Sequence, residues 1–126
     1  MSGASETLQD WQHAARTAFK AALEAGHPAS LTSDAVAGLA TRVTAIIAIG
    51  KAAAAMTIAA RQSRHHCSAI ALNVPGIIVT NDDNFMSVNG MDCYASAHPV
   101  PDERGLTAAK AVTQMAKDLS GDDHLL

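Results

Sequence analysis

Residues 44–56 read Thr-Ala-Ile-Ile-Ala-Ile-Gly-Lys-Ala-Ala-Ala-Ala-Met. The six residues 44–49 are almost wholly apolar, as in a strand that is buried on both faces of a parallel sheet. The alanine-rich run that follows has strong helix propensity, so Gly50 and Lys51 form a strand-to-helix turn. Such a turn falls at the carboxyl edge of the strand, where ligands bind in open α/β sheets.

The positive charge of Lys51 is unfavourable at the start of the helix that it opens. A helix N-terminus carries partial positive charge and favours anions by about 0.3–1 kcal/mol. A lysine there predicts a negatively charged ligand, either a carboxylate or a phosphoryl group in transfer. The structural alternative is that Gly50 supplies only a tight turn and that Lys51 extends into water. The pattern is neither a P-loop nor a Gly-x-Gly-x-x-Gly dinucleotide motif.

Short apolar strands and helices continue to alternate along the chain. Residues 76–80 and 92–97 are predicted strands, and the polar residues 81–84 between them form a turn. A last helix is expected from Pro101 to Ser120, with Asp102 as its cap. One face of this helix is apolar and contains Leu106, Ala109, Val112, Ala116 and Leu119. We therefore expect a Rossmann-like α/β fold, an open and mostly parallel sheet with flanking helices.

A leading helical segment, residues 1–42, is expected to precede a βαβ-type core, residues 43–126, within one partial domain spanning residues 1–126. Leu8, Trp11, Phe19 and Leu23 recur at helical spacing in this segment. The spacing predicts one buried stripe, and Trp11 is interpreted as an anchor in the core.

Composition excludes several classes of function. The 126 residues are 48% apolar and 17% charged, which is typical of one globular domain. The net charge of −3 without a basic cluster argues against nucleic acid as a partner. No apolar run approaches the roughly 20 residues that span a bilayer, so no membrane association is expected. Cys67 and Cys93 lack paired spacing and no secretory signal precedes them, so a cytoplasmic protein is expected.

Residues 97–106 read Ala-His-Pro-Val-Pro-Asp-Glu-Arg-Gly-Leu. Together with residues 50–56 and 76–81, they resemble the amino-terminal domain of bacterial and archaeal glycerate 2-kinases, the group also labelled hydroxypyruvate reductase in tartrate utilisation. Each motif is short, but their order and spacing match over most of the chain. The resemblance implies transfer of the terminal phosphoryl group of ATP to the 2-hydroxyl of glycerate with Mg²⁺. It also implies that Lys51 is a catalytic residue in a cleft between two domains.

The strand ends supply the remaining candidates for substrate binding, which are Gly50, Asn81 and His98. Because parallel strands end at one edge, Lys51 is expected within reach of Asn81 or His98. His98 precedes a proline, which favours extended geometry, and its imidazole is either an acid, a base or a substrate donor, or a hydrogen-bond partner of its own loop.

No metal site is assigned from the sequence. Asp82 and Asp83 have side chains suited to Mg²⁺ but are interpreted as turn residues. The neighbouring His65, His66 and Cys67 are interpreted as a solvated helix end, because no second ligand group has zinc spacing.

Proteins that the chain resembles continue into a Ser-Gly-Gly loop and a second domain. Residues 121–126 are interpreted as a turn and the first residues of a strand. We expect the chain to be a truncated fragment that is inactive in isolation, binds ATP poorly and forms a homo-oligomer through uncovered apolar surface or a free strand edge. The alternatives are an NAD(P)H-dependent hydroxypyruvate reductase and a non-catalytic α/β binding module.

Overall fold

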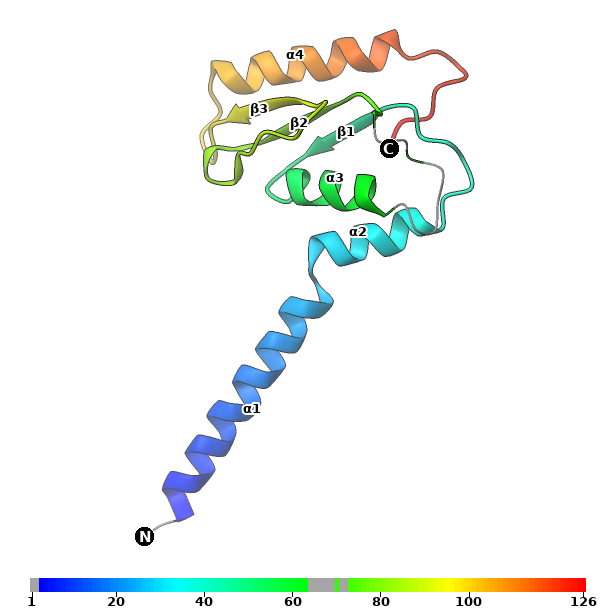
Figure 1. Cartoon of the computed structure of the whole chain (residues 1–126). Coiled ribbons are helices and arrows are strands. Elements are labelled where there is room, and N and C mark those ends of the chain that lie inside the picture. The colour runs from blue at the N-terminus through cyan, green and yellow to red at the C-terminus, as the bar shows by residue number, and fades with distance from the viewer. Residues whose placement is uncertain (1–2, 64–69, 71–72) are drawn as a thin grey trace.

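Parallel strands and flanking helices form an α/β fold (Figure 1). The structure is a computed structural model that describes residues 3–63, 70 and 73–126. Its sheet has three strands in the order β1-β2-β3, with α4 over one face and α3 over the other. The α/β class expected from the sequence is therefore confirmed. The predicted helix end at His65, His66 and Cys67 lies outside the described residues.

The three strands are β1 (Ile46–Ile49), β2 (Gly76–Asn81) and β3 (Asp92–Ser96). Both pairings are parallel, with Ile49 opposite Val79 and Asn81 opposite Ser96. Ile78, at the centre of β2, is fully buried because helices cover both faces of the sheet at this point. The parallel register brings the carboxyl ends of all three strands to one edge.

The last residues of the chain lie along the free edge of β1. Leu125 forms a parallel bridge with Ala45, and the Leu126 N–H donates a hydrogen bond of 3.0 Å to the Ala45 carbonyl. The Thr44 hydroxyl donates to the Asp123 carboxylate at 2.8 Å, which fixes the preceding turn. From β1 the chain adds β2 and then β3 on one side. After α4 it returns to β1, where Leu125 pairs with the other side of that strand. The strand order reverses there.

Helices α2 (Pro28–Ala37) and α3 (Ala53–Gln62) pack against each other on one side of the sheet. Small side chains allow α3 to lie close to the sheet, because Ala53 and Ala54 contact Ile78 of β2 directly. A second cluster joins Val36 of α2 to Ile46 of β1. The core is accordingly built from alanine, valine and isoleucine.

Helix α4 (Glu103–Asp118) covers β3 and part of β2 on the opposite face. Ala108 is its buried residue, whereas Leu106 is 51% exposed and Ala109 is also exposed. The predicted apolar face was therefore wrong at Leu106, Ala109 and Ala116, whereas Val112 and Leu119 are half-buried. The helix presents its small residues to the sheet, as Gly105 does where a Cβ atom would lie 3.7 Å from Ser96 Cβ.

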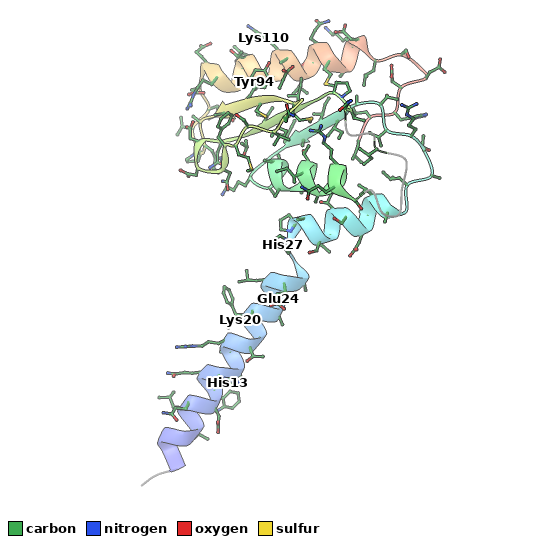
Figure 2. The ribbon with its side chains drawn as sticks, in the orientation of Figure 1. His13, Lys20, Glu24, His27, Tyr94 and Lys110 are labelled. Atoms are coloured by element: carbon green, nitrogen blue, oxygen red, sulfur yellow. The ribbon has the colours of Figure 1, made fainter. Side chains whose placement is uncertain are left out.

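Helix α1 (Gly3–Ala25) projects away from the rest of the molecule (Figure 1). No described element packs along it, and its side chains, including His13 and Lys20, stand apart from the sheet (Figure 2). Trp11 is 72% exposed and Phe19 is 65% exposed. The prediction that Trp11 anchors the core was wrong, because helical spacing identifies an apolar stripe but not what covers it.

Gly76 provides a test of the packing between β1 and β2. A Cβ atom on Gly76 would collide with the Ile46 carbonyl oxygen and the Met91 methyl group. The Ile46 oxygen is backbone and cannot move aside. We expect Gly76→Ala to lower the free energy of unfolding by about 1–3 kcal/mol, measured by urea denaturation followed by far-UV circular dichroism.

The matched control is Gly121→Ala, because a Cβ atom at Gly121 meets nothing within 4 Å. Its effect should stay within about 0.5 kcal/mol. Equal losses for the two variants would contradict this account of the packing.

Candidate functional site at the carboxyl edge of the sheet

The turn after β1 is set by Gly50. Its φ of +125° is a conformation that side chains disfavour, although a Cβ atom there would find open space. The Gly50 N–H donates to the Val79 carbonyl at 2.9 Å, and the Gly50 carbonyl accepts from the Ala53 N–H at 3.2 Å. Gly50 thus holds the end of β1 against β2, and α3 begins three residues later.

Lys51 lies exposed in this turn, two residues before α3 begins at Ala53. The helix was expected to begin at Lys51 itself. The N-cap residue, Ala52, has no side chain that could cap the helix, and the first turn contains no acidic residue. Within the part of the chain that the structure describes, Lys51 has no ion-pair partner. Lys51 therefore immediately precedes a helix N-terminus that has no side-chain cap, and both the ammonium group and the helix N-terminus favour an anion.

Asn81 ends β2 and is half-buried. Its side chain forms hydrogen bonds with residues of the short helix η1 (Asp82–Asn84) that follows. The Asn81 Oδ1 accepts a hydrogen bond from Asn84 Nδ2 at 2.6 Å, and its Nδ2 donates to Asp83 at 3.4 Å. The Asn81 amide therefore stabilises the turn at the sheet edge.

His98 follows β3 and is exposed, and the peptide bond to Pro99 is cis. Asp102 then caps α4, as the sequence predicts. Its Oδ1 accepts from the Arg104 N–H at 3.1 Å and from the Gly105 N–H at 3.4 Å. The loop that carries His98 is thus held between β3 and a capped helix.

Arg104 joins the turn after β2 to the N-cap of α4, and no sequence pattern predicted this bridge. Its guanidinium donates two hydrogen bonds to Asp82, of 2.7 and 3.0 Å, and its Nε donates to Asp102 at 2.8 Å. Arg104, like Lys51, is a cation near a helix N-terminus, where the helix dipole disfavours it. A cation at the start of a predicted helix is therefore the sequence feature that could have indicated the bridge. Here two carboxylates pair with the positive charge of Arg104.

These contacts set the local charges. The side-chain hydrogen bond from Arg104, with the Gly105 N–H, lowers the pKa of Asp102 below its ordinary value. Asp82 and Asp102 raise the pKa of Arg104 above its ordinary value. Arg104 therefore stays charged at any pH at which the protein folds.

The carboxylates after β2 do not form a Mg²⁺ site in the described part of the chain. Both oxygens of Asp82 accept hydrogen bonds from Arg104, and Asp83 accepts one from Asn81 Nδ2 at 3.4 Å. Among the described residues, no group of three or more His, Cys, Asp or Glu side chains is placed to hold a metal ion. Any Mg²⁺ that accompanies a nucleotide would need ligands other than this carboxylate pair.

The structure brings Gly50, Lys51, Asn81 and His98 to the same edge of the sheet, since each lies at or just after the end of a parallel strand. Among the described residues, no hydrogen bond or ion pair joins Lys51 to Asn81 or His98. The edge is an exposed surface with one unpaired ammonium, and the predicted roles of these residues stay predictions.

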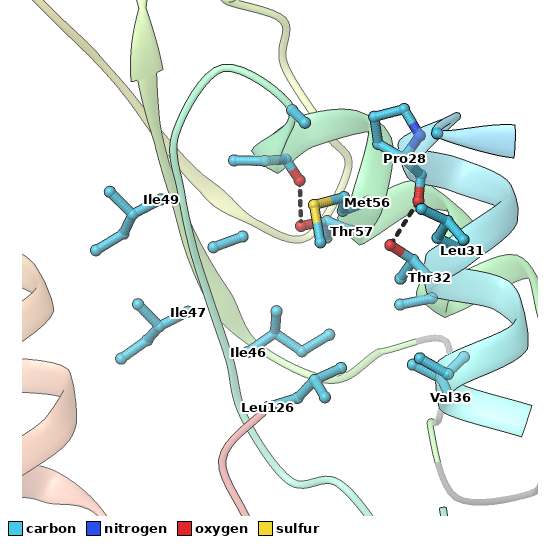
Figure 3. Close-up of a pocket in the computed structure, with 16 residues that line it drawn as sticks. Pro28, Leu31, Thr32, Val36, Ile46, Ile47, Ile49, Met56, Thr57 and Leu126 are labelled. Atoms are coloured by element: carbon cyan, nitrogen blue, oxygen red, sulfur yellow. Dashed lines mark hydrogen bonds between the residues drawn. The ribbon is translucent and has the colours of Figure 1, made fainter. Parts of the chain in front are cut away.

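A cavity of about 690 Å³ lies beside this edge, between α2, β1 and α3 (Figure 3). We call it the α2–α3 groove. Its lining contains only apolar residues, glycine and threonine. The two threonine hydroxyls, of Thr32 and Thr57, donate to carbonyls of their own helices at 2.7 and 2.8 Å. The groove therefore offers apolar surface and no free polar side chain. Its larger side chains are those of Leu31, Val36, Ile46, Met56 and Leu126, and Ile47 and Ile49 line it from the other side of β1 (Figure 3).

The sequence profile of one protein family, described as a domain of unknown function (DUF4147), matches residues 14–126. The chain belongs to the DUF4147 family. A search of curated proteins found no match to this DUF4147 chain. None of its described helices has a stretch long and apolar enough to cross a membrane.

The DUF4147 chain is similar to the crystal structure of glycerate kinase from Thermotoga maritima, with a TM-score of 0.78 and 24% sequence identity. The match covers 93% of the DUF4147 chain and 27% of the glycerate kinase chain. At 24% sequence identity, this similarity shows that the two proteins share a fold in the matched region. The DUF4147 chain therefore spans about a quarter of the length of this relative.

The Arg104 bridge predicts a pH-dependent difference in stability. In the folded protein the pKa of Asp102 is lowered, mainly by Arg104, so the stabilisation is present above the ordinary carboxyl pKa of about 3.9. It is lost as the pH falls through the lowered value. We expect Arg104→Gln to be less stable than wild type at pH 6, and the difference in unfolding free energy to shrink below about pH 4.

Urea denaturation at a series of pH values measures this difference. Arg16→Gln on the exposed α1 is the control and should show no such convergence. A gap between wild type and Arg104→Gln that stays constant from pH 6 to pH 3 would argue against the bridge.

Proposed function

We propose that this DUF4147 chain is part of a glycerate 2-kinase that transfers the terminal phosphoryl group of ATP to the 2-hydroxyl of glycerate. The observation that carries the proposal is the unpaired Lys51 beside the uncapped N-terminus of α3. It is supported by the position of this turn, where the strand order reverses at the carboxyl edge of β1, a usual ligand position in such folds. The fold shared with a glycerate kinase adds further support.

The chemistry of phosphoryl transfer fits these groups. A bond forms between the glycerate oxygen and the phosphorus, the bond from that phosphorus to the leaving phosphate oxygen breaks, and the hydroxyl proton departs. Catalysis depends mainly on positioning and on stabilising the charge of the phosphoryl oxygens. Lys51 provides one positive charge for the glycerate carboxylate or for those oxygens.

His98 is the candidate within this chain for handling the hydroxyl proton or for donating a hydrogen bond to substrate. Its imidazole is exposed at the same edge, after the end of β3. Imidazole is a common general acid or base in enzymes and can also donate a hydrogen bond to a substrate oxygen. Gly50 and Asn81 are proposed to shape the substrate surface, Gly50 through its backbone and Asn81 by holding the η1 turn.

We propose that the activity belongs to a longer protein, because the chain covers 27% of the related kinase. The sequence contains no P-loop, and the carboxylates that the structure describes do not form a Mg²⁺ site. On this proposal ATP and Mg²⁺ are held largely by other parts of the protein. The isolated chain is then expected to show no turnover and only weak ATP binding in a calorimetric titration.

Lys51 provides the test of the proposed function. In the longer protein that carries these residues, Lys51→Ala should lower kcat/KM for glycerate by about 100-fold or more, since one stabilising charge is removed. Stability should change by less than about 0.5 kcal/mol, because the side chain is exposed. Product formation from ATP, Mg²⁺ and glycerate is followed by ³¹P NMR.

Lys117→Ala is the matched control, because Lys117 lies in the last turn of α4, at the end of the helix remote from its N-cap at the sheet edge. It should leave activity unchanged. A parallel assay with NADH and hydroxypyruvate tests the reductase alternative. Reduction of hydroxypyruvate without phosphorylation of glycerate, or equal activity of Lys51→Ala and wild type, would refute the proposal.

A further inference from the structure

We infer that α1 of one copy docks in the α2–α3 groove of a second copy, so that the chain forms a two-fold dimer by exchange of its N-terminal helix. Each copy exposes one apolar helix stripe and one apolar groove. The inference is independent of the proposed kinase function, because it involves neither Lys51 nor His98.

The stripe of α1 is a strong candidate for burial. Leu8, Trp11, Phe19 and Leu23 are all more than half exposed. By helical spacing Asp10 lies opposite the stripe, whereas Arg16 and Lys20 flank it, so the stripe itself contains no charged side chain. A single amphipathic helix gains most of its stability from packing its apolar side. The α1 helix therefore needs a partner surface that is also apolar.

The α2–α3 groove matches that requirement. No charged residue lines it, and its threonine hydroxyls are already bonded within their own helices. A polar small molecule would find no side chain to orient it. Leu31, 52% exposed, and Met56, 43% exposed, leave apolar surface open to solvent at the groove. The surface suits an apolar helix face.

The connection between α1 and α2 prevents α1 from reaching its own groove. The Gly26 N–H donates to the Ala22 carbonyl at 2.9 Å, the His27 N–H to the Glu24 carbonyl at 3.3 Å, and the Leu31 N–H to the His27 carbonyl at 3.1 Å. These bonds tie the two-residue link to the helices on both sides. The 23 residues of α1 extend about 34 Å away from the link, and docking in the same copy would require the chain to reverse there.

The area involved is sufficient for a stable dimer. Covering the two aromatic and two leucine side chains of one stripe removes roughly 400 Å² from water, since one buried aromatic side chain alone covers about 150–250 Å². Two stripes and the two grooves that cover them then bury roughly 1,600 Å², the usual size of a stable interface. A two-fold axis makes both contacts identical.

The test uses sedimentation velocity on the 126-residue chain over a range of concentrations. Wild type should form a dimer. Phe19→Asp alters the stripe and Leu31→Asp alters the groove, at positions that are exposed in one copy and should not disturb folding. Each should raise the dimer dissociation constant about 100-fold or more, because a charge enters both apolar contacts.

Mixing the two variants distinguishes this dimer from others. The intact stripe of Leu31→Asp can dock in the intact groove of Phe19→Asp, so the mixture should associate more strongly than either variant alone. Thr17→Asp, elsewhere on α1, and Ser30→Asp, outside the groove, are the controls and should dimerise as wild type does.

Three results would overturn the inference. A wild-type chain that stays monomeric at all concentrations excludes the dimer. A Leu31→Asp variant that dimerises like wild type would indicate direct pairing of two α1 helices. Unchanged dimerisation of Phe19→Asp would indicate association through another surface, such as the edge of β1.

Discussion

The hydrogen bond from the Gly50 N–H to the Val79 carbonyl is the contact on which the polar edge depends. It holds the end of β1 against β2 while Gly50 adopts a positive φ, so the chain leaves the sheet and enters α3 almost at once. The direction of that exit places Lys51 outside the sheet and the alanines of α3 directly over Ile78. Packing and chemistry are therefore set by the same short turn.

Two cations near helix starts show how surroundings decide what a residue can do. Arg104 is bound by Asp82 and Asp102, and it ties two loops of the sheet edge together. Lys51 has no carboxylate partner among the described residues, and α3 has no side-chain cap. The first cation is satisfied by the protein itself. The second retains its electrostatic preference for an anion, and this contrast is stronger support for a binding role than the exposure of Lys51 alone.

The sequence predicted the features that depend on local pattern. The apolar run before Gly50 and the alanines after it sufficed to predict a strand, a turn and a helix, and all three are present. The cap at Asp102 was predicted for the same reason, since its hydrogen bonds reach only two and three residues ahead.

Features that depend on distant partners were missed. The bridge from Arg104 to Asp82 joins residues 22 positions apart, which no local pattern indicates. The stripe around Trp11 was correctly placed on one side of a helix, but periodicity does not specify whether the sheet, another chain or water faces it. In the first half of α4 the buried face was misplaced by one residue, because Gly105 and Ala108, rather than Leu106 and Ala109, lie against the sheet.

The exposed position of Trp11 has a spectroscopic consequence. It is the sole tryptophan of the chain, and it lies on α1, on which no described element packs. The fluorescence emission of Trp11 therefore depends on the surroundings of the projecting helix and hardly depends on the sheet. The sheet carries a different intrinsic chromophore, Tyr94 of β3, the sole tyrosine. The two aromatic side chains thus act as separate optical reporters for the two parts of the molecule.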